Sequence, residues 1–455
     1  MEILALVLFV LICAALLLGY PVALTLAGVS LLCAGVGVAT GTFDSSYLHA
    51  LPSRLYGILT NQTLMAVPLF VFMGVMLEKS NVAESLLTAM AQLLGKYKAG
   101  LGVAVILVGT LLAASTGIVG ATVVTMGLLA LPTMLKRGYS APLATGTICA
   151  TGTLGQIIPP SIALVLLGDV LSSAYQKAQL SMGIFSPKSV SVGDLFVGAV
   201  VPGLMLVVLY LIYVLAMGKF SNSVDSETAE DVEQVSLLRL LQVLFPPLAL
   251  IVVVLGSILF GFATPTEAAG VGAMGAMVIA LSQGVLTWPK LKAVCLETGH
   301  VTSKVFLILI GASIFSIVFR GFGGETLIHS FFSELPGGVF MAMLIVMALI
   351  FMLGFILDFI EITFVVIPLV APVLLAMGLD PIWLGIMIAI NLQTSFLTPP
   401  FGFALFYLRG VAPASIATTE IYKGVAPFIA IQLLLLIILA LWPELVTALP
   451  QWLNS

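Results

Sequence analysis

Long apolar runs most constrain what this chain can fold into. They recur from residue 3 to residue 446, and most hold about 20 residues, enough for an α-helix to cross a hydrocarbon core about 30 Å thick. Strands of a membrane β-barrel would instead alternate apolar and polar positions. Only 8% of the residues are charged, compared with about 25% in soluble domains. The sequence therefore predicts an all-α polytopic protein embedded in a lipid bilayer.

Two of the runs have the wrong length for one crossing. The first, over about 99–135, would be about 55 Å long as one helix, and its midpoint reads ASTGIVGAT. Small and hydroxyl-bearing residues of this kind can turn the chain. The second, over about 338–378, has the midpoint GFILDFIEIT, with two carboxylates at membrane depth. We expect two re-entrant hairpins whose tips lie inside the protein.

The two hairpin regions resemble each other in sequence. Adding 240 to the residue number carries one set of residues onto another without a gap: Pro132 onto Pro372, Gly138 onto Gly378, and Pro159-Pro160 onto Pro399-Pro400. This register predicts a first repeat over 1–218, a polar cytoplasmic linker over 219–236 and a second repeat over 237–455. Five full spans and one hairpin in each half would invert the second repeat relative to the first.

Charge bias gives an orientation. If both ends of the first hairpin (its feet) lie on the cytoplasmic side, only four of the 16 Lys and Arg residues lie outside the cell membrane, namely Arg54, Lys177, Lys188 and Arg320. The remaining twelve lie on the cytoplasmic side, as the positive-inside rule requires. This orientation places the feet of the second hairpin and both termini outside.

The proline pairs predict interrupted helices over about 141–170 and about 381–409. Proline lacks an amide hydrogen and displaces the carbonyl four residues earlier, so we expect free carbonyls at four residues: Gly155, Gln156, Ser395 and Phe396. Irregular backbone is tolerated in a bilayer where it is buried in protein or lines a cavity. Inverted repeats with paired hairpins and interrupted helices are the architecture of secondary transporters, whose ion and substrate sites lie near the midplane.

Several motifs together resemble one family. They are GTLGQIIPPS (152–161), FATPTEAAGVGA (262–273), ILDFIEITFVVIPLVAP (356–372), GLDP (378–381) and TPPFGFALFYLRG (398–410). With these motifs the chain resembles, along essentially its whole length, the DctM-like large membrane subunit (M) of tripartite ATP-independent periplasmic (TRAP) transporters.

The resemblance implies a bacterial inner-membrane permease that takes up organic acids by an elevator movement driven by sodium (Na⁺). It also implies two partners, a small four-helix membrane subunit and a periplasmic substrate-binding protein. The runner-up is a stand-alone sodium/anion symporter or channel of related fold. The sequence does not name the acid.

The resemblance also implies site residues. The first sodium site would use the hairpin tip and the first break: Ser115, Thr116, Gly117, Thr153 and Gly155. The second would use Gly354, Asp358, Ser395 and Thr398. Candidate substrate ligands are Gln156, Ser161, Asn391 and Gln393, of which the last two could equally make interhelix hydrogen bonds. Many family members carry an aspartate in the first hairpin, where this chain has Thr122.

Other polar residues have structural interpretations. Glu267 in TPTEAA is expected to cap a helix, and Glu361 could either share the face of Asp358 or anchor the hairpin. The segment over 81–98 is expected to form an interfacial arm. We expect no catalytic residues and no transition-metal site, because the three histidines form no His-Glu-x-x-His motif. A net charge of −4 indicates no nucleic-acid partner.

Overall fold

The computed structural model describes residues 2–80, 82–94, 97, 99–220 and 237–453. Every regular element of this part of the chain is helical, so the predicted fold class is confirmed as all-helical. Residues 221–236, most of the predicted linker, lie outside the described residues.

The chain forms two compact units, each assembled from three separate segments. Unit 1 comprises Met1–Met65, Leu166–Ser191 and Gly299–Gly385, and unit 2 comprises Ala66–Val165, Val192–Thr298 and Ile386–Ser455. Neither unit corresponds to one predicted repeat. The division of the chain into repeats over 1–218 and 237–455 stays a prediction.

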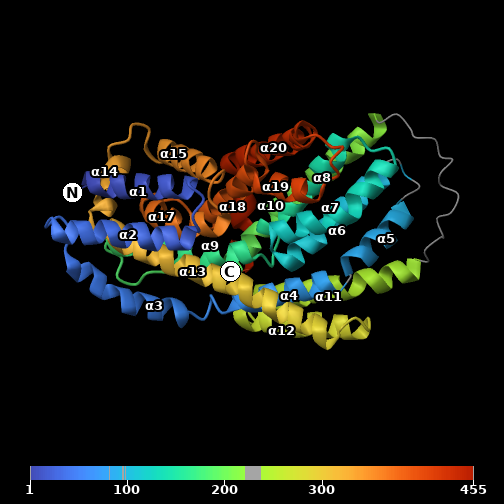
Figure 1. Cartoon of the computed structure of the whole chain (residues 1–455), viewed down its shortest axis with the longest axis horizontal. Coiled ribbons are helices and arrows are strands. Elements are labelled where there is room, and N and C mark those ends of the chain that lie inside the picture. Colours follow the sequence, from blue (N-terminus) through green and yellow to red (C-terminus); the bar gives the residue numbers. More distant parts are fainter. Residues whose placement is uncertain (1, 81, 95–96, 98, 221–236, 454–455) are drawn as a thin grey trace. The chain divides into compact units, whose positions relative to one another are not determined.

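Unit 1 contains the N-terminal helices and the second hairpin. Figure 1 shows α1 and α2 side by side, and these two helices are in contact. The elements that lie wholly in the unit are α1 (Glu2–Leu17), α2 (Val22–Ala39), η1 (Ser45–Ala50), α3 (Leu51–Leu59), α14 (Gly324–Ser333), α15 (Gly338–Leu353), α16 (Phe359–Val365) and α17 (Ile367–Ala376). Three further helices have residues in both units: α9 (Ile162–Ser181), α13 (Trp288–Gly321) and α18 (Pro381–Leu397).

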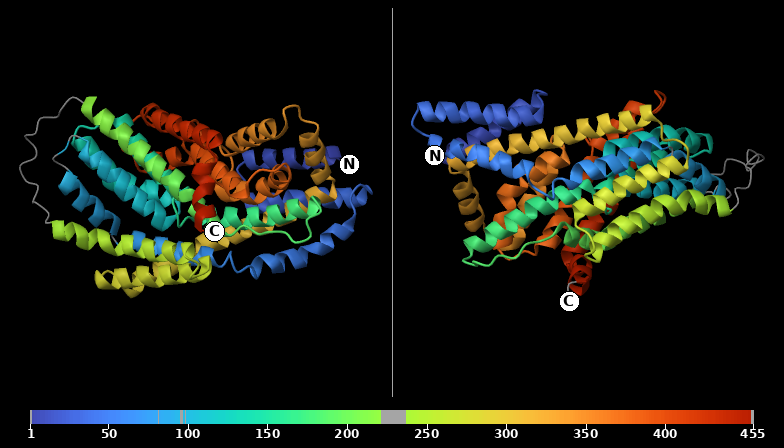
Figure 2. Two further views of the ribbon diagram at one scale, coloured as in Figure 1. Left: turned by 180° about the vertical axis from the view of Figure 1, so that it is seen from behind. Right: turned by 90° about the horizontal axis from the view of Figure 1, so that it is seen from below.

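Unit 2 contains the first hairpin and the first helix break. Its elements are α4 (Ala66–Lys79), α5 (Val82–Leu94), α6 (Gly100–Thr116), α7 (Val119–Lys136), α8 (Ala141–Thr153), η2 (Leu154–Gln156), α10 (Val192–Phe220), α11 (Leu237–Leu259), α12 (Pro265–Ser282), α19 (Phe403–Val411), α20 (Thr418–Leu441) and α21 (Glu444–Leu453). Both views in Figure 2 show α11 and α12 side by side, and these helices are in contact.

Helix α8 lies at the centre of unit 2. All its residues from Leu143 to Thr153 are buried, and it contacts α6, α7, α19 and α20. A helix that is buried on every side needs no polar face. The C-terminal end of α8, where the predicted site residue Thr153 lies, is therefore held inside the unit.

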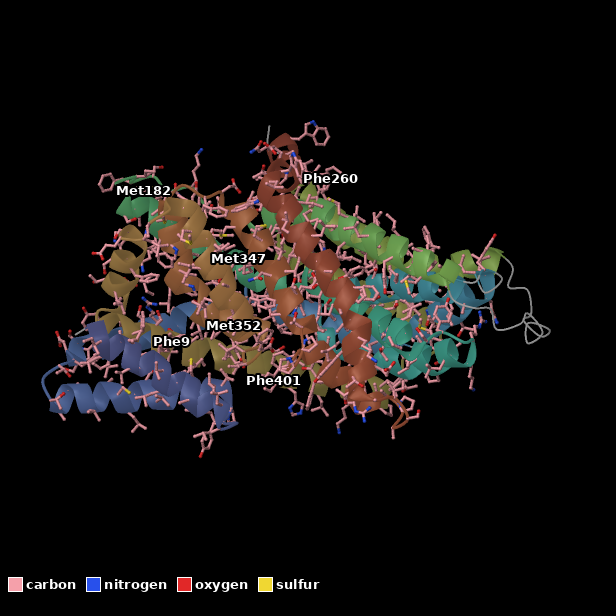
Figure 3. All side chains as sticks on the ribbon, turned by 90° about the horizontal axis from the view of Figure 1, so that it is seen from above. Phe9, Met182, Phe260, Met347, Met352 and Phe401 are labelled. Carbon is pink, nitrogen blue, oxygen red and sulfur yellow. The ribbon has the colours of Figure 1, made fainter. Side chains whose placement is uncertain are left out.

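Seven helices of the described residues are long and apolar enough to cross a membrane, or up to nine if each bent pair is one span. The ten crossings expected from the apolar runs are more numerous, because several runs are divided into shorter helices. Many large apolar side chains are exposed, and Phe260, which is labelled in Figure 3, is 69% exposed. Such a surface requires an apolar solvent.

The apolar run over residues 56–77 does not form one continuous helix. The chain leaves helix after Leu59 and resumes at Ala66. In between, the side-chain oxygen of Asn61 accepts the amide hydrogens of Thr63 at 2.9 Å and Leu64 at 3.3 Å. Asparagine favours such local turns over helix. Within the segment over 81–98, which was predicted as an interfacial arm, the described residues Val82–Leu94 form the helix α5, and the interfacial position stays a prediction.

Local structure matches across the 240-residue offset. Helices α7 and α17 end, and α8 and α18 begin, at residues 240 apart. Gly138 and Gly378 both have positive φ, and their amides donate to Leu135 at 3.0 Å and Leu375 at 3.1 Å. The two helices thus end in the same way, as an internal repeat predicts.

The capping predicted for Glu267 is confirmed. Its carboxylate accepts the amide of Thr264 at 2.8 Å, and the Thr264 hydroxyl accepts the amide of Glu267 at 3.3 Å. This reciprocal pair is a capping box, and it fixes the start of α12.

Candidate functional site

The tip of the first hairpin is a tight turn between α6 and α7. Gly117 ends α6 with φ 62°, and its amide donates to Ala113 at 2.9 Å. A side chain is strained in this left-handed conformation. A Cβ atom there would also lie 3.2 Å from the backbone nitrogen of Ile162, at the start of α9. The predicted helix-turn-helix is therefore present, and its tip is packed against the chain that follows the first break.

Hydroxyl groups surround this tip. Ser115 and Thr116 each donate to the carbonyl of Leu112 at 2.9 Å. The hydroxyl oxygens of Thr116 and Thr122 lie 2.9 Å apart, so a threonine pair bridges the turn between α6 and α7. Because a hydroxyl oxygen has two lone pairs, Ser115 keeps acceptor capacity for a cation.

The first interrupted helix breaks where the proline pair predicts. Helix α8 ends at Thr153, the short turn η2 follows, and α9 begins after Ser161. The bond between Pro159 and Pro160 is cis, as is the bond between the repeat-related prolines. The break also touches the hairpin, because a Cβ atom on Gly155 would lie 3.0 Å from the carbonyl oxygen of Ala113. The predicted residues of the first sodium site thus lie together in unit 2.

Ser161 lies at the start of the second half of this helix. Its hydroxyl donates to the carbonyl of Gln156 at 3.0 Å and accepts the amide of Leu164 at 3.4 Å. These bonds give the side chain a structural role in closing the break.

Two repeat-related residues form a hydrogen bond. The amide nitrogen of Gln393, on α18, donates to the hydroxyl of Thr153 at 3.3 Å, which is the interhelix bond that the sequence left open. The amide oxygens of Gln393 and Gln156 are buried and have no hydrogen-bond partner among the described residues. Such acceptors suit a cation or a hydroxyl donor. Asn391, the other amide of α18, is also buried.

The tip of the second hairpin is organised by carboxylates. Helix α15 ends at Leu353 with Gly354 as its C-cap, and α16 begins after Asp358. Asp358 and Glu361 form a capping box, in which the Glu361 carboxylate accepts the amide of Asp358 at 2.8 Å. Glu361 therefore anchors the hairpin. Lys304 of α13 lies near enough for its charge to act on both carboxylates. The sequence did not predict this proximity, because Lys304 is far from Asp358 and Glu361 along the chain.

The second interrupted helix breaks between α18 and α19. Ser395 donates to the carbonyl of Leu392 at 2.7 Å, and Thr398 donates to that of Thr394 at 2.7 Å. These hydroxyls belong to unit 2, whereas Gly354 and Asp358 belong to unit 1. The second sodium site stays a prediction.

The expectation of four free carbonyls is wrong for two of them. The carbonyl of Gln156 accepts the Ser161 hydroxyl, and that of Ser395 accepts the amide of Thr398 at 3.1 Å. The physical reason is that each break tightens into a turn, which supplies new donors in place of the lost helical amides.

The broken helices, hairpins and buried oxygen atoms define a membrane transporter fold. The solved YdaH transporter of Alcanivorax borkumensis has the same fold, with a TM-score of 0.60 at 15% identity over 88% of this chain and 90% of that one. The chain belongs to the family "Tripartite ATP-independent periplasmic transporter, DctM component", which matches residues 8–445. It is therefore a multi-pass membrane protein of a bacterial TRAP transporter, and a transporter subunit rather than an enzyme.

Two relatives illustrate the family. The C4-dicarboxylate TRAP transporter large permease protein DctM of Pseudomonas aeruginosa is 30% identical over 90% of this chain and 92% of its own. The isethionate TRAP transporter permease protein DctMQ of Oleidesulfovibrio alaskensis is 27% identical over 94% of this chain, which spans 64% of that relative. The two are named for different substrates, so family membership leaves the substrate open.

Proposed function

We propose that this chain is the permease of a sodium-coupled uptake system for organic acids in the bacterial inner membrane. The observation that carries the proposal is the packed first hairpin tip, which gathers hydroxyl groups and an interrupted helix in one place within a chain of the TRAP permease family. Sodium favours hard oxygen ligands, and proteins supply them from hydroxyls, carbonyls and carboxylates.

The first sodium ion would bind between the first hairpin tip and the first break. Its ligands would be oxygen atoms of the predicted set, Ser115, Thr116, Gly117, Thr153 and Gly155. The threonine bridge across the tip supports this assignment, since it orders the turn without a carboxylate. The second ion would bind Asp358 and the oxygens of Gly354, Ser395 and Thr398.

Substrate would bind beside the breaks, at Gln156, Ser161, Asn391 or Gln393. The amide oxygens of Gln156 and Gln393, which are buried and have no partner in the part of the chain that the structure describes, support a ligand that carries a hydroxyl group or brings a cation with it. A carboxylate alone offers these atoms no donor.

Transport would follow an elevator movement between two inverted repeats, with the hairpin feet on opposite sides of the membrane. The charge distribution supports that orientation, and the matching helix ends at Gly138 and Gly378 support the repeat. A periplasmic binding protein would deliver the acid. The extra length of the DctMQ relative supports a small four-helix membrane subunit as the second partner.

Reconstitution tests the proposal. The binding protein is first screened against organic acids to find its ligand, and uptake of that acid is then measured in proteoliposomes that contain this chain and the small subunit. We expect uptake only with the binding protein present and with sodium outside, and none when choline replaces sodium. Uptake by this chain alone would establish the stand-alone symporter instead, and uptake unaffected by choline would refute sodium coupling.

A further inference from the structure

Unit 1 contains a cavity of about 420 Å³ that none of the predicted sodium or substrate ligands lines. Its walls come from α3 and the turn after it, α9, α13, α14, α16 and α17. The volume falls within the range of small-molecule sites, about 300–1,000 Å³. We call it the unit-1 cavity.

Three cations line the unit-1 cavity: Arg54, Lys177 and Arg320. Glu325 lies 2.5 Å from the Lys177 nitrogen and 3.7 Å from the Arg320 nitrogen, so one carboxylate is shared by two of the cations. Arg54 has no ion pair or hydrogen bond among the described residues. It also lines, together with Arg320, a neighbouring cavity of about 260 Å³, which places the two guanidinium-bearing side chains on a common wall.

The rest of the cavity combines fixed polar groups with apolar walls. The Asn61 oxygen is engaged by two backbone amides of its own turn, and its nitrogen donates to Asp169 at 3.0 Å. Hydroxyl groups of Ser173, Ser313 and Ser316 line it as well. A lipid acyl chain would leave these polar groups unpaired, whereas a small polar anion would not.

We propose that the unit-1 cavity is a binding site for a small organic carboxylate, whose carboxylate group is held by Arg54 with Arg320. A guanidinium suits this task because its planar fork binds carboxylates in a bidentate manner. The inference rests on the proposed function for its place in transport: in the proposed orientation these cations lie outside, where a binding protein would release its acid. The cavity would be the first site to receive it.

The proposal predicts that some variants weaken carboxylate binding and that another strengthens it. Arg54→Gln removes the cation that has no ion pair among the described residues, and it should weaken carboxylate binding about 10- to 100-fold, the range for a lost charged hydrogen bond. Arg54→Lys keeps the charge but loses the fork, and it should lie between. Glu325→Gln releases Lys177 and Arg320 from a competing carboxylate and should tighten binding about two- to fivefold. The matched control is Lys188→Gln, an exposed cation of the same unit that does not line the cavity.

The assay is equilibrium dialysis of radiolabelled succinate against the full chain purified in detergent at low salt, with succinamide as the uncharged competitor. We expect wild type to bind succinate more tightly than succinamide. The affinity for succinate should be highest for Glu325→Gln, lower and equal for wild type and Lys188→Gln, lower again for Arg54→Lys, and lowest for Arg54→Gln. Size-exclusion profiles identify any variant that has not folded, and the exposed Arg54 and Lys188 positions give two variants that do not depend on core packing.

Four results would overturn the proposal. Wild type could fail to prefer succinate over succinamide, Arg54→Gln could bind as wild type does, or Lys188→Gln could lose as much affinity as Arg54→Gln. Displacement of succinate by phosphatidylglycerol and not by other small carboxylates would also overturn it, in favour of a lipid headgroup site. The binding assay needs no sodium gradient and no partner, so loss of uptake and loss of succinate binding are separate findings.

Discussion

Replacing Gly117 by alanine tests whether the first hairpin tip binds sodium. Gly117 has φ 62° and is packed against Ile162. A good control is Gly284, which follows α12 with φ 67° and where an added Cβ atom would have no neighbour within 4 Å. Both alanine variants therefore meet the same backbone strain, but only one of them lies at the proposed ion site.

The magnitude follows from the conformation. An alanine in the left-handed region costs about 1–2 kcal/mol, and at position 117 the contact of 3.2 Å with the Ile162 nitrogen adds to this. Without sodium, the substituted tip can relax from the strained turn. Binding must then restore the turn, so the apparent sodium affinity should fall by the strain energy, about 5- to 30-fold. Gly284→Ala should leave sodium affinity unchanged.

The assay is initial uptake against external sodium in proteoliposomes that contain the complete transporter, with equal amounts of each variant incorporated. A Gly117→Ala curve that coincides with the Gly284→Ala curve would refute a sodium site at this tip. A reduced maximal rate with an unchanged half-saturating sodium concentration would also refute it, because strain would then slow the movement and not the binding.

Three further predictions concern charge, topology and pH. Asp358→Asn should raise the half-saturating sodium concentration or abolish uptake while the small subunit still co-purifies, and an unchanged sodium curve would leave Asp358 a capping residue only. Cysteines at the exposed positions of Lys136 and Glu334, in a background without native cysteines, should react with an impermeant maleimide from opposite sides of the membrane, whereas labelling of both from one side would contradict the inversion. The hydroxyl of Tyr139 accepts the Gly102 amide at 3.1 Å, and burial raises the pKa of this tyrosine. The stabilisation that comes from the neutral Tyr139 side chain should therefore be complete below about pH 10 and should fall as the pH rises through the raised pKa. The free energy of unfolding of wild type should therefore fall more between about pH 9 and 11 than that of Tyr139→Phe, and equal falls would show that this tyrosine does not titrate on unfolding.

The sequence predicted the features that depend on local chemistry. Apolar runs and the low fraction of charged residues required helices in a bilayer, because backbone groups there must be paired within the segment. The breaks at Pro159-Pro160 and Pro399-Pro400 follow from a missing amide hydrogen, and the cap at Thr264 and Glu267 follows from their spacing. These expectations needed no knowledge of distant contacts.

The sequence-based predictions were wrong where a polar group has a hydrogen-bond partner that is distant in the chain or is brought close by a turn. The carbonyl of Gln156 was expected to be free, but the break brings the Ser161 hydroxyl to it. The run over 56–77 was apolar enough for a span, yet Asn61 turns the chain by binding its own backbone and Asp169. In both cases a polar side chain satisfies groups that composition alone leaves unassigned.

The sequence by itself thus determined the class of protein, the two hairpins and the two breaks, because each depends on residues close together in the chain. Only the tertiary structure decided which groups face one another. It joined Gln393 to Thr153 across 240 residues, set the charge of Lys304 near Asp358, and brought Arg54, Lys177 and Arg320 to one cavity from three separate helices. The reason is physical: helix formation is governed by neighbours within a few residues, whereas the place of a buried amide or an unpaired cation is set by the packing of all the helices around it.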